Sequence, residues 1–304
     1  MLILLPLLAC LSCGGQADTP LDEEAVRLSK INRIDTTTIL SVINPDTIEG
    51  REALEQLSAK AWMLIEDGSG CLISEKNAGQ RMYMASLTKM MTCLLALEKG
   101  TMTDSIEITE DVFITKDSRV RLGDGFIMDD LIKEMMLISD NDAAYALAKH
   151  IGGDTLSFCG LMNEKAAYLG MNDTHFANPN GMPNDSNYST AHDLAKLARY
   201  CMTDSTFASI VGTREKDIPL LDGRHLPCKN SNALLHTYEG CIGIKTGFTR
   251  QAGYCLASAA TRDDITLILI LLNSRSMSSR FTESIALLDY GFNVMAAFRK
   301  KQGL

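Results

Sequence analysis

A serine and a lysine three residues apart, Ser86 and Lys89, stand where an apolar helical pattern begins. Residues i and i+3 of an α-helix share one face and lie about 5–6 Å apart at Cβ, so the serine Oγ and the lysine Nζ can reach hydrogen-bond distance. The apolar residues after Lys89 recur at helical spacing, and Gly100 is a typical helix stop. The sequence therefore predicts a helix that begins at Ser86, carries both polar side chains in its first turn and ends at Gly100.

This pair has the residue types of a nucleophile and its base. A lysine can take a serine proton only if burial or a neighbouring cation lowers its pKa, because an ammonium group that titrates near ~10.4 is no base at neutral pH. In the first turn of a helix, the helix dipole would also favour the serine alkoxide. The same spacing occurs by chance on solvated helix faces, so the interpretation depends on the residues further along the chain.

Two further motifs occur in order, Ser139-Asp140-Asn141 and Lys245-Thr246-Gly247. The three motifs together are typical of penicillin-binding proteins and class A β-lactamases. The chain between them also resembles the serine D-alanyl-D-alanine carboxypeptidases, the low-molecular-mass penicillin-binding proteins of the β-lactamase/transpeptidase-like superfamily. The resemblance covers roughly residues 60–295 and includes Asn178-Pro179-Asn180-Gly181, Tyr188-Ser189-Thr190-Ala191 and Ala252-Gly253-Tyr254.

The resemblance implies an α/β fold, in which an antiparallel sheet is flanked by helices and a helical lobe is inserted at about residues 101–226. Hydrophobic patterning agrees, because residues 265–272 are apolar on both faces, as a central strand must be. Strands are also predicted at 62–65 and 71–73, around the hairpin signal Asp67-Gly68-Ser69-Gly70, and at 243–246 and 253–260. Helices are predicted at 131–137, 143–151 and 281–292.

The resemblance also implies a reaction mechanism. Ser86 attacks the carbonyl of a penultimate D-alanine and Lys89 removes the serine proton. Ser139 relays that proton to the departing amine, and Asn141 holds both the substrate amide and Lys89. For Asp140, a catalytic role and a purely structural role both remain open.

Substrate binding is expected to involve the third motif. Lys245 attracts the C-terminal carboxylate of the peptide and lowers the pKa of Lys89 by its charge, while Thr246 donates a hydrogen bond to the same carboxylate. Ser231 stands where some relatives carry an arginine that helps to bind the carboxylate, so substrate affinity is an open question.

Backbone N–H groups are expected to stabilise the oxyanion of the tetrahedral intermediate. The resemblance assigns this role to the N–H groups of Ser86 and Phe248. Gly247 directly precedes Phe248, and its lack of a side chain would let the strand approach the ligand closely.

The function that the resemblance implies is removal of the terminal D-Ala from peptidoglycan stem pentapeptides, with inhibition by β-lactams. The alternatives are a serine β-lactamase or a D,D-endopeptidase of the same fold, and a non-catalytic cell-wall-binding lipoprotein. A β-lactamase would be favoured by a deacylating glutamate in the loop before the K-T-G strand, and residues 176–184 contain no glutamate. Carboxypeptidase and endopeptidase activities are not distinguished by sequence.

The first residues read as an export signal. The apolar run at residues 2–9 is shorter than the ~20 residues that span a bilayer. Its end, Leu7-Leu8-Ala9-Cys10, resembles a bacterial lipobox, with lipidation at Cys10 and Cys13 as the competing site, although no Lys or Arg precedes the run. We expect an exported, membrane-anchored lipoprotein facing the periplasm or the cell exterior.

The expected organisation is a signal region at 1–13, a tether and lead-in at 14–58 with one helix near 50–58, and a catalytic domain at 59–304 without a C-terminal β domain. A net charge of −9 and the lack of a basic run argue against a nucleic-acid partner. The five histidines show no metal-ligand spacing, so we expect no metal and no cofactor. Seven irregularly spaced cysteines lie beyond Cys13 and are expected to be buried rather than to form a disulfide framework.

Overall fold

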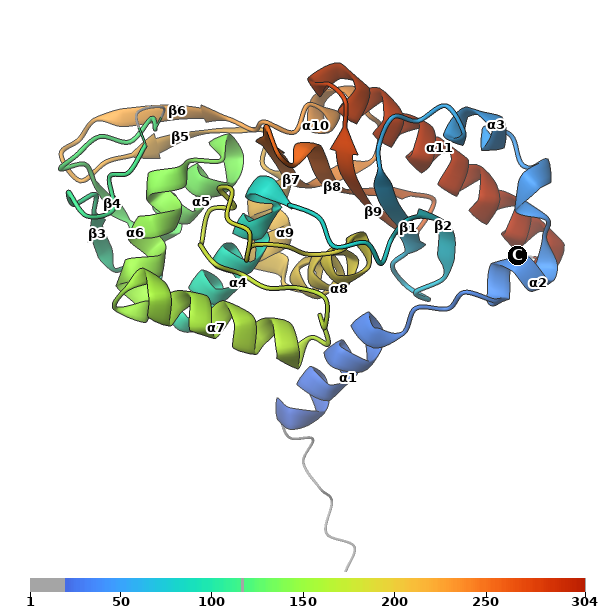
Figure 1. Ribbon diagram of the computed structural model, residues 1–304, viewed down its shortest axis with the longest axis horizontal. Coiled ribbons are helices and arrows are strands. Elements are labelled where there is room, and N and C mark those ends of the chain that lie inside the picture. Colours follow the sequence, from blue (N-terminus) through green and yellow to red (C-terminus); the bar gives the residue numbers. More distant parts are fainter. Residues whose placement is uncertain (1–19, 116–117, 304) are drawn as a thin grey trace, which may run out of the picture.

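A five-stranded antiparallel sheet lies at the centre of the computed structural model, which describes residues 20–115 and 118–303 (Figure 1). The strand order is β2-β1-β9-β8-β7, so β7 and β2 are the edges. The predicted hairpin and the three predicted C-terminal strands are all confirmed. The strands are β1 (Ala61–Glu66), β2 (Leu72–Lys76), β7 (Cys241–Thr249), β8 (Gly253–Arg262) and β9 (Ile265–Ser274).

Helices cover both faces of this sheet, because the central strand β9 is apolar on both sides. Residues 267–272 are fully buried and alternate between two hydrophobic clusters. Ile268, Ile270 and Leu272 belong to the cluster shared with the helical lobe, and their neighbours in sequence belong to the cluster under α11 (Met277–Gln302). This is the period-2 pattern of a strand buried on two faces. α11 is more than twice as long as the predicted helix at 281–292.

The lobe between β2 and β7 contains the predicted helices and two hairpins that were not predicted. The predicted helices correspond to α5 (Met128–Ile138) and α6 (Asn141–Gly152), and the lobe also holds α4 (Lys89–Lys99), α7 (Thr155–Tyr168), α8 (Ala191–Met202) and α9 (Ser205–Gly212). The hairpins are β3 (Ser105–Glu107) with β4 (Gly125–Ile127), and β5 (Glu215–Pro219) with β6 (His225–Lys229). Figure 1 shows the longer hairpin reaching over α5 toward the shorter one.

The helix start at Ser86 differs from the prediction. Ser86 lies in a single 3₁₀ turn, η2 (Ala85–Thr88), and α4 begins only at Lys89. Tighter winding still places the two residues on one side of the turn, because side chains at i and i+3 eclipse in a 3₁₀ helix. The predicted end of the helix at Gly100 is confirmed, since the Gly100 N–H donates to Ala96 O.

The segment before the sheet is more ordered than the predicted tether with one helix. It forms α1 (Pro20–Asn32), α2 (Thr38–Val42), η1 (Pro45–Thr47) and a one-turn α3 (Arg51–Leu54) in place of the helix at 50–58. Ile31 is fully buried in the main core, and Tyr200 Oη of α8 donates a 2.6 Å hydrogen bond to Glu24 of α1. The residues expected to form the signal lie outside the described part.

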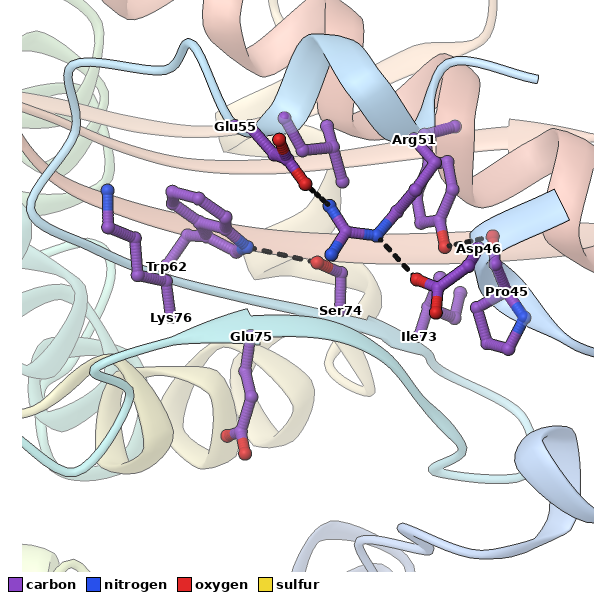
Figure 2. Close-up of a pocket in the computed structure, with 11 residues that line it drawn as sticks. Pro45, Asp46, Arg51, Glu55, Trp62, Ile73, Ser74, Glu75 and Lys76 are labelled. Carbon is purple, nitrogen blue, oxygen red and sulfur yellow. Dashed lines mark hydrogen bonds and ion pairs between the residues drawn. The ribbon is translucent and has the colours of Figure 1, made fainter. Parts of the chain in front are cut away.

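The lead-in and the sheet edge that is remote from β7 border a common cavity (Figure 2). Figure 2 shows Arg51 between Asp46 and Glu55, at N–O distances of 3.1 and 3.7 Å, while Trp62 Nε1 donates to Ser74 Oγ at 3.1 Å. These residues border a cavity of about 560 Å³. These polar groups are already paired and Trp62 is only 5% exposed. We therefore interpret the cavity as a gap where the lead-in packs against β1 and β2.

Buried thiols complete the core as predicted. Six of the seven cysteines in the described residues are buried, the seventh, Cys241, is half-buried, and all seven are free thiols. No helix in the described residues combines the length and the apolar character needed to cross a bilayer.

Candidate active site

The predicted serine and lysine are in direct contact. Lys89 Nζ donates a 3.0 Å hydrogen bond to Ser86 Oγ. It also donates to Asn141 Oδ1 at 3.0 Å and to the backbone oxygen of Asn180 at 2.9 Å. The three hydrogens of an ammonium would all be used by these acceptors, so the lysine is held in one position against the hydroxyl.

Burial gives this lysine the properties of a base. Lys89 is fully buried, and loss of solvation lowers its pKa to about 7. The carboxylates of Asp140 and Glu134 act in the opposite direction but do not compensate for the burial. At neutral pH a substantial fraction of Lys89 is therefore an uncharged amine that can accept the Ser86 proton.

The turn between α5 and α6 carries the second motif. Ser139 ends α5 in the left-handed region, with φ of 69°, and Asp140 caps α6 by accepting hydrogen bonds from Asp142 N and Ala143 N. This geometry turns the chain sharply, so that Asn141 reaches Lys89 within two residues of Ser139.

Asp140 is occupied by structural hydrogen bonds. Besides capping α6, its carboxylate accepts 2.7 Å hydrogen bonds from Ser118 Oγ and a 2.8 Å bond from Arg119 N. These contacts fix the loop between β3 and β4. Of the two roles left open for Asp140, the geometry favours the structural one.

The third motif lies on the open edge of the sheet. β7 pairs with β8 on one side only, and its other edge faces η2. A Cβ atom built on Gly247 would lie 3.1 Å from Ser86 N, so the strand passes directly beside the serine backbone. Thr246 Oγ1 and Ser231 Oγ are 2.6 Å apart. The structure thus places Thr246, Gly247 and Phe248 beside Ser86.

Lys245 differs from the expectation in one respect. It was expected to lower the pKa of Lys89 by charge, whereas burial is what lowers the pKa of Lys89. Lys245 is itself buried, and its own pKa is lowered well below the ordinary value, first by desolvation and then by the charge of Lys89. Its Nζ donates to Thr246 O at 3.0 Å.

The loop at 178–181 was not assigned a role from sequence. Its Asn180 carbonyl is an acceptor for Lys89, and Gly181, with φ of +86°, passes so close to η2 that a Cβ there would lie 1.9 Å from Ala85 O. Only glycine fits this approach. The Asn-Pro-Asn-Gly composition signals a turn, but a backbone carbonyl leaves no mark on the sequence.

A buried cation on the closing helix was also missed. Arg280 of α11 is 5% exposed and its Nη1 donates to Gly247 O at 3.4 Å. No carboxylate in the described residues forms an ion pair with it. An arginine on an amphipathic helix is usually solvated. The sequence pattern therefore did not predict the buried position of Arg280 behind the third motif.

Two of the five histidines lie in hydrogen-bonded, structural positions. His175 Nδ1 lies 2.5 Å from Ser186 O, and its ring stacks on Tyr188. His192 Nδ1 lies 3.4 Å from Asp193, a buried carboxylate that also accepts hydrogen bonds from residues 173 and 174. In the described residues no group of three His, Cys, Asp or Glu could hold a metal ion.

A serine hydroxyl bonded to a buried lysine, beside the open edge of an antiparallel sheet, defines a serine-type acyl-transfer enzyme with a β-lactamase-like fold. Residues 48–276 match the model of the D-alanyl-D-alanine carboxypeptidase family. The chain belongs to this family.

Individual relatives support the same placement. The chain is 32% identical to D-alanyl-D-alanine carboxypeptidase DacF of Bacillus subtilis, with 77% of the chain and 62% of the relative covered. It is 34% identical to the D-alanyl-D-alanine carboxypeptidase of Streptomyces sp. strain K15, with 78% and 88% covered. The chain thus spans less than two thirds of the first relative and most of the second.

Solved structures show the same fold. The crystal structure of the Streptomyces K15 DD-transpeptidase aligns with a TM-score of 0.74 at 33% identity, covering 78% of this chain and 97% of that one. D-alanyl-D-alanine carboxypeptidase DacD from Francisella tularensis aligns with a TM-score of 0.72 at 31% identity, covering 82% and 72%. The predicted family and fold class are both confirmed.

Proposed function

We propose that this chain is a serine D-alanyl-D-alanine carboxypeptidase that removes the terminal D-Ala of peptidoglycan stem pentapeptides and is acylated by β-lactams. The observation that carries the proposal is the 3.0 Å contact between Ser86 Oγ and Lys89 Nζ, with the pKa of Lys89 lowered to about 7. Family membership supports the same activity.

The first step is acylation of Ser86. Its Oγ attacks the carbonyl carbon of the penultimate D-alanine while its proton moves to Lys89 Nζ, and the carbonyl becomes an oxyanion. Collapse of this intermediate breaks the C–N bond. The departing amine takes a proton that Ser139 relays from Lys89. D-alanine then leaves, and the acyl group of the peptide remains bound to Ser86 as an ester.

The oxyanion is held by backbone N–H groups of Ser86 and Phe248. The close approach of the strand to the serine turn supports this role, because a Cβ atom built on Gly247 would lie 3.1 Å from Ser86 N. Removing one such donor typically costs about 10² to 10³ in rate.

Binding of the substrate carboxylate is the role of the third motif and its neighbours. Lys245 supplies a cation, and Thr246 and Ser231 form a hydroxyl pair at 2.6 Å. Arg280 adds a second cation behind the same strand and offsets the absence of an arginine at position 231. Charging two buried basic groups that have no carboxylate partner in the described residues is costly unless an anion joins them.

The free edge of β7 offers backbone groups to an extended peptide. A substrate that adds as one more strand would place its carboxylate near Thr246 and its scissile carbonyl near Phe248, because a strand rises about 3.3 Å per residue. Asn141, whose Oδ1 accepts a hydrogen bond from Lys89, can hold the substrate amide.

Deacylation distinguishes a peptidase from a β-lactamase. The peptide leaving group departs and opens the ester to water, whereas an opened β-lactam keeps its leaving group tethered. Residues 176–184 supply no acidic side chain that could activate a water for rapid β-lactam hydrolysis.

The test combines a labelled penicillin with a pentapeptide that ends in D-Ala-D-Ala. We expect mass mapping to place a long-lived penicillin ester on Ser86, and we expect D-alanine to be released from the peptide. The variant Ser86→Ala should show neither. Rapid turnover of penicillin without release of D-alanine would contradict the proposal and favour a β-lactamase.

We also propose that residues 1–13 are a lipoprotein-type signal region, that 14–58 connect it to a catalytic domain at 59–304, and that the lobe at 101–226 is inserted in that domain. The apolar run that ends at Cys10 supports lipidation there, which would anchor the protein to the outer face of the membrane. If the double variant Cys10→Ala/Cys13→Ala keeps its membrane association and its precursor processing, the anchor is not at these cysteines.

A further inference from the structure

One buried carboxyl group near the active site is not used in the proposed reaction. Glu134 of α5 is fully buried, and neither of its carboxyl oxygens has a hydrogen-bond partner in the described residues. The residues around it on the helix, among them Ile132 and Met135, are apolar and buried. Burying a carboxyl group without a partner is costly, whereas an apolar side chain would be stabilising at such a position. A buried titratable group of this kind is therefore a candidate for a role in the function of the site.

The helix that carries Glu134 also supports the catalytic residues. α5 ends one residue before Ser139 and packs against α4, whose first residue is Lys89. Lys89 Nζ donates its three hydrogen bonds to other acceptors. Glu134 can therefore influence Lys89 through its charge but not through a direct hydrogen bond. Because the protein interior screens charges far less than water does, this influence extends beyond hydrogen-bond distance.

Several charged or titratable side chains act on Glu134 from the segments packed around α5. They are Lys89 at the start of α4, Asp140 and Asp142 at the start of α6, Arg119 in the loop between β3 and β4, and Cys228 of β6. Lys216 of β5 is the cross-strand partner of Cys228, and Glu107 of β3 is exposed. α9 and β4 also pack on α5 and contain no titratable side chain. Of these groups, Lys89 is the one in contact with the Ser86 hydroxyl.

Burial and charge bring the titrations of Glu134 and Lys89 closer together. Desolvation raises the pKa of Glu134 well above its ordinary value and the charge of Asp140 adds to this, while the charge of Lys89 lowers it. Desolvation lowers the pKa of Lys89 to about 7, and the charges of Asp140 and Glu134 raise it. The charged form of each group thus stabilises the charged form of the other. Buried groups that interact in this way titrate as a pair.

We propose that Glu134 is a positioning residue for the acylation step: its carboxylate stabilises the charged form of Lys89 and thereby sets the lower pH limit of Ser86 acylation. This inference rests on the proposed function and concerns the regulation of the same site. Charged Lys89 cannot accept the Ser86 proton, so acylation stops as the pH falls and the lysine takes up a proton. Without the Glu134 carboxylate, Lys89 should stay uncharged down to a lower pH.

The experiment measures the rate of Ser86 acylation by a chromogenic β-lactam as a function of pH. We expect Glu134→Gln, which keeps the shape of the side chain but not its charge, to move the midpoint of the acid limb to lower pH by about half a unit to one unit. At about pH 6 this shift makes the variant about three- to tenfold faster than the wild type. At more acid pH the two profiles should converge, because Glu134 of the wild type is then protonated. Glu134→Asp retains a carboxylate and should stay close to the wild-type midpoint.

The matched control is Glu164→Gln, which makes the same chemical change at an exposed position of α7 and should keep the wild-type midpoint. Glu134→Leu is a second neutral variant and should shift the midpoint as Glu134→Gln does, whatever its effect on stability. A thermal unfolding measurement checks that each variant is folded. An unchanged midpoint in the neutral variants, or a loss of rate that is equal at every pH, would overturn the inference.

A second measurement separates failure of this inference from failure of the proposed function. In protein that is isotope-labelled at lysine Cε, the NMR resonance of Lys89, assigned by its absence in Lys89→Met, reports the protonation of this lysine without any substrate. The midpoint of its titration should fall in Glu134→Gln by the same amount as that of the acylation rate, even if no peptide releases D-alanine. An unchanged resonance midpoint would overturn the role of Glu134 and leave the acyl-enzyme chemistry intact.

Discussion

The two lysines of the site lie in opposite surroundings. Lys89, at the start of α4, donates to three acceptors from three segments. Lys245, on the edge strand β7, is equally buried, yet its hydrogen bond in the described residues goes to the next residue of its own strand. Burial lowers the pKa of both groups. The two lysines therefore differ in how many of their ammonium hydrogens are already used in hydrogen bonds, and not in how deeply they are buried.

This difference separates the two functions of a buried lysine. A base must be fixed against the proton that it takes, and the acceptors around Lys89 leave no donor for a ligand. A cation that binds substrate needs donors to spare, and one ammonium hydrogen of Lys245 is used by Thr246 O. Its lowered pKa also means that an arriving carboxylate would favour proton uptake, so binding and charging of Lys245 are coupled.

The largest expected effect comes from removing the fixed lysine. Lys89→Met should lower the rate of Ser86 acylation by about 10⁴-fold, the upper range for loss of a general base. Reversible ligand binding should change little, because Lys89 has no spare donor. Stopped-flow kinetics with a chromogenic β-lactam would resolve the two constants. A comparable loss in affinity would remove the distinction between the lysines.

The second effect is a pH dependence of the same step. Only uncharged Lys89 accepts a proton, and its pKa is about 7, so the acylation rate should rise through neutral pH and level off above it. Below pH 7 the rate should fall about tenfold per unit, which is about 10² at pH 5. An acid limb centred near the ordinary lysine pKa of ~10.4 would show that Lys89 is solvated.

A smaller effect is expected from the lysine of the edge strand. Lys245→Met removes a charged hydrogen bond to the ligand carboxylate, which is worth about 10- to 100-fold. The loss should fall mainly on affinity, in contrast to Lys89→Met. Because Arg280 stands behind the same strand, the double variant Lys245→Met/Arg280→Met should lose more than either single one. Additive losses would indicate that the two cations act on separate groups.

Most of the sheet and the motif residues could be predicted because they depend on local signals. The hairpin at Asp67-Gly68 and the apolar strand β9 have recognisable turn composition and hydrophobic periodicity. The three catalytic motifs are recognisable from their residue types and spacing. The β5–β6 hairpin carried the turn signal Asp222-Gly223, but Pro219 and Pro227 argue against a strand, and tertiary contact with α5 overrides them.

The electrostatics of the site could not be predicted, since they depend on contacts between distant segments. The contact between Lys89 and Asn141 was expected from the resemblance, but nothing in the sequence predicts that the Asn180 carbonyl is the third acceptor of Lys89. Sequence reasoning also assigned the lowered pKa of Lys89 to Lys245. Only the fold shows that burial is the cause, because exposure is a property of packing.

The smallest expected effect concerns Ser231, where some relatives carry an arginine. Its hydroxyl lies 2.6 Å from Thr246 Oγ1, so it orients the threonine rather than supplying charge. Ser231→Ala should raise KM for a pentapeptide by about two- to tenfold, the worth of one neutral hydrogen bond, with kcat nearly unchanged. Ser231→Arg tests the same position from the other side: if Lys245 and Arg280 already saturate the carboxylate, a third cation should improve affinity little. A gain of about 100-fold or more would show that the two buried cations do not reach the ligand.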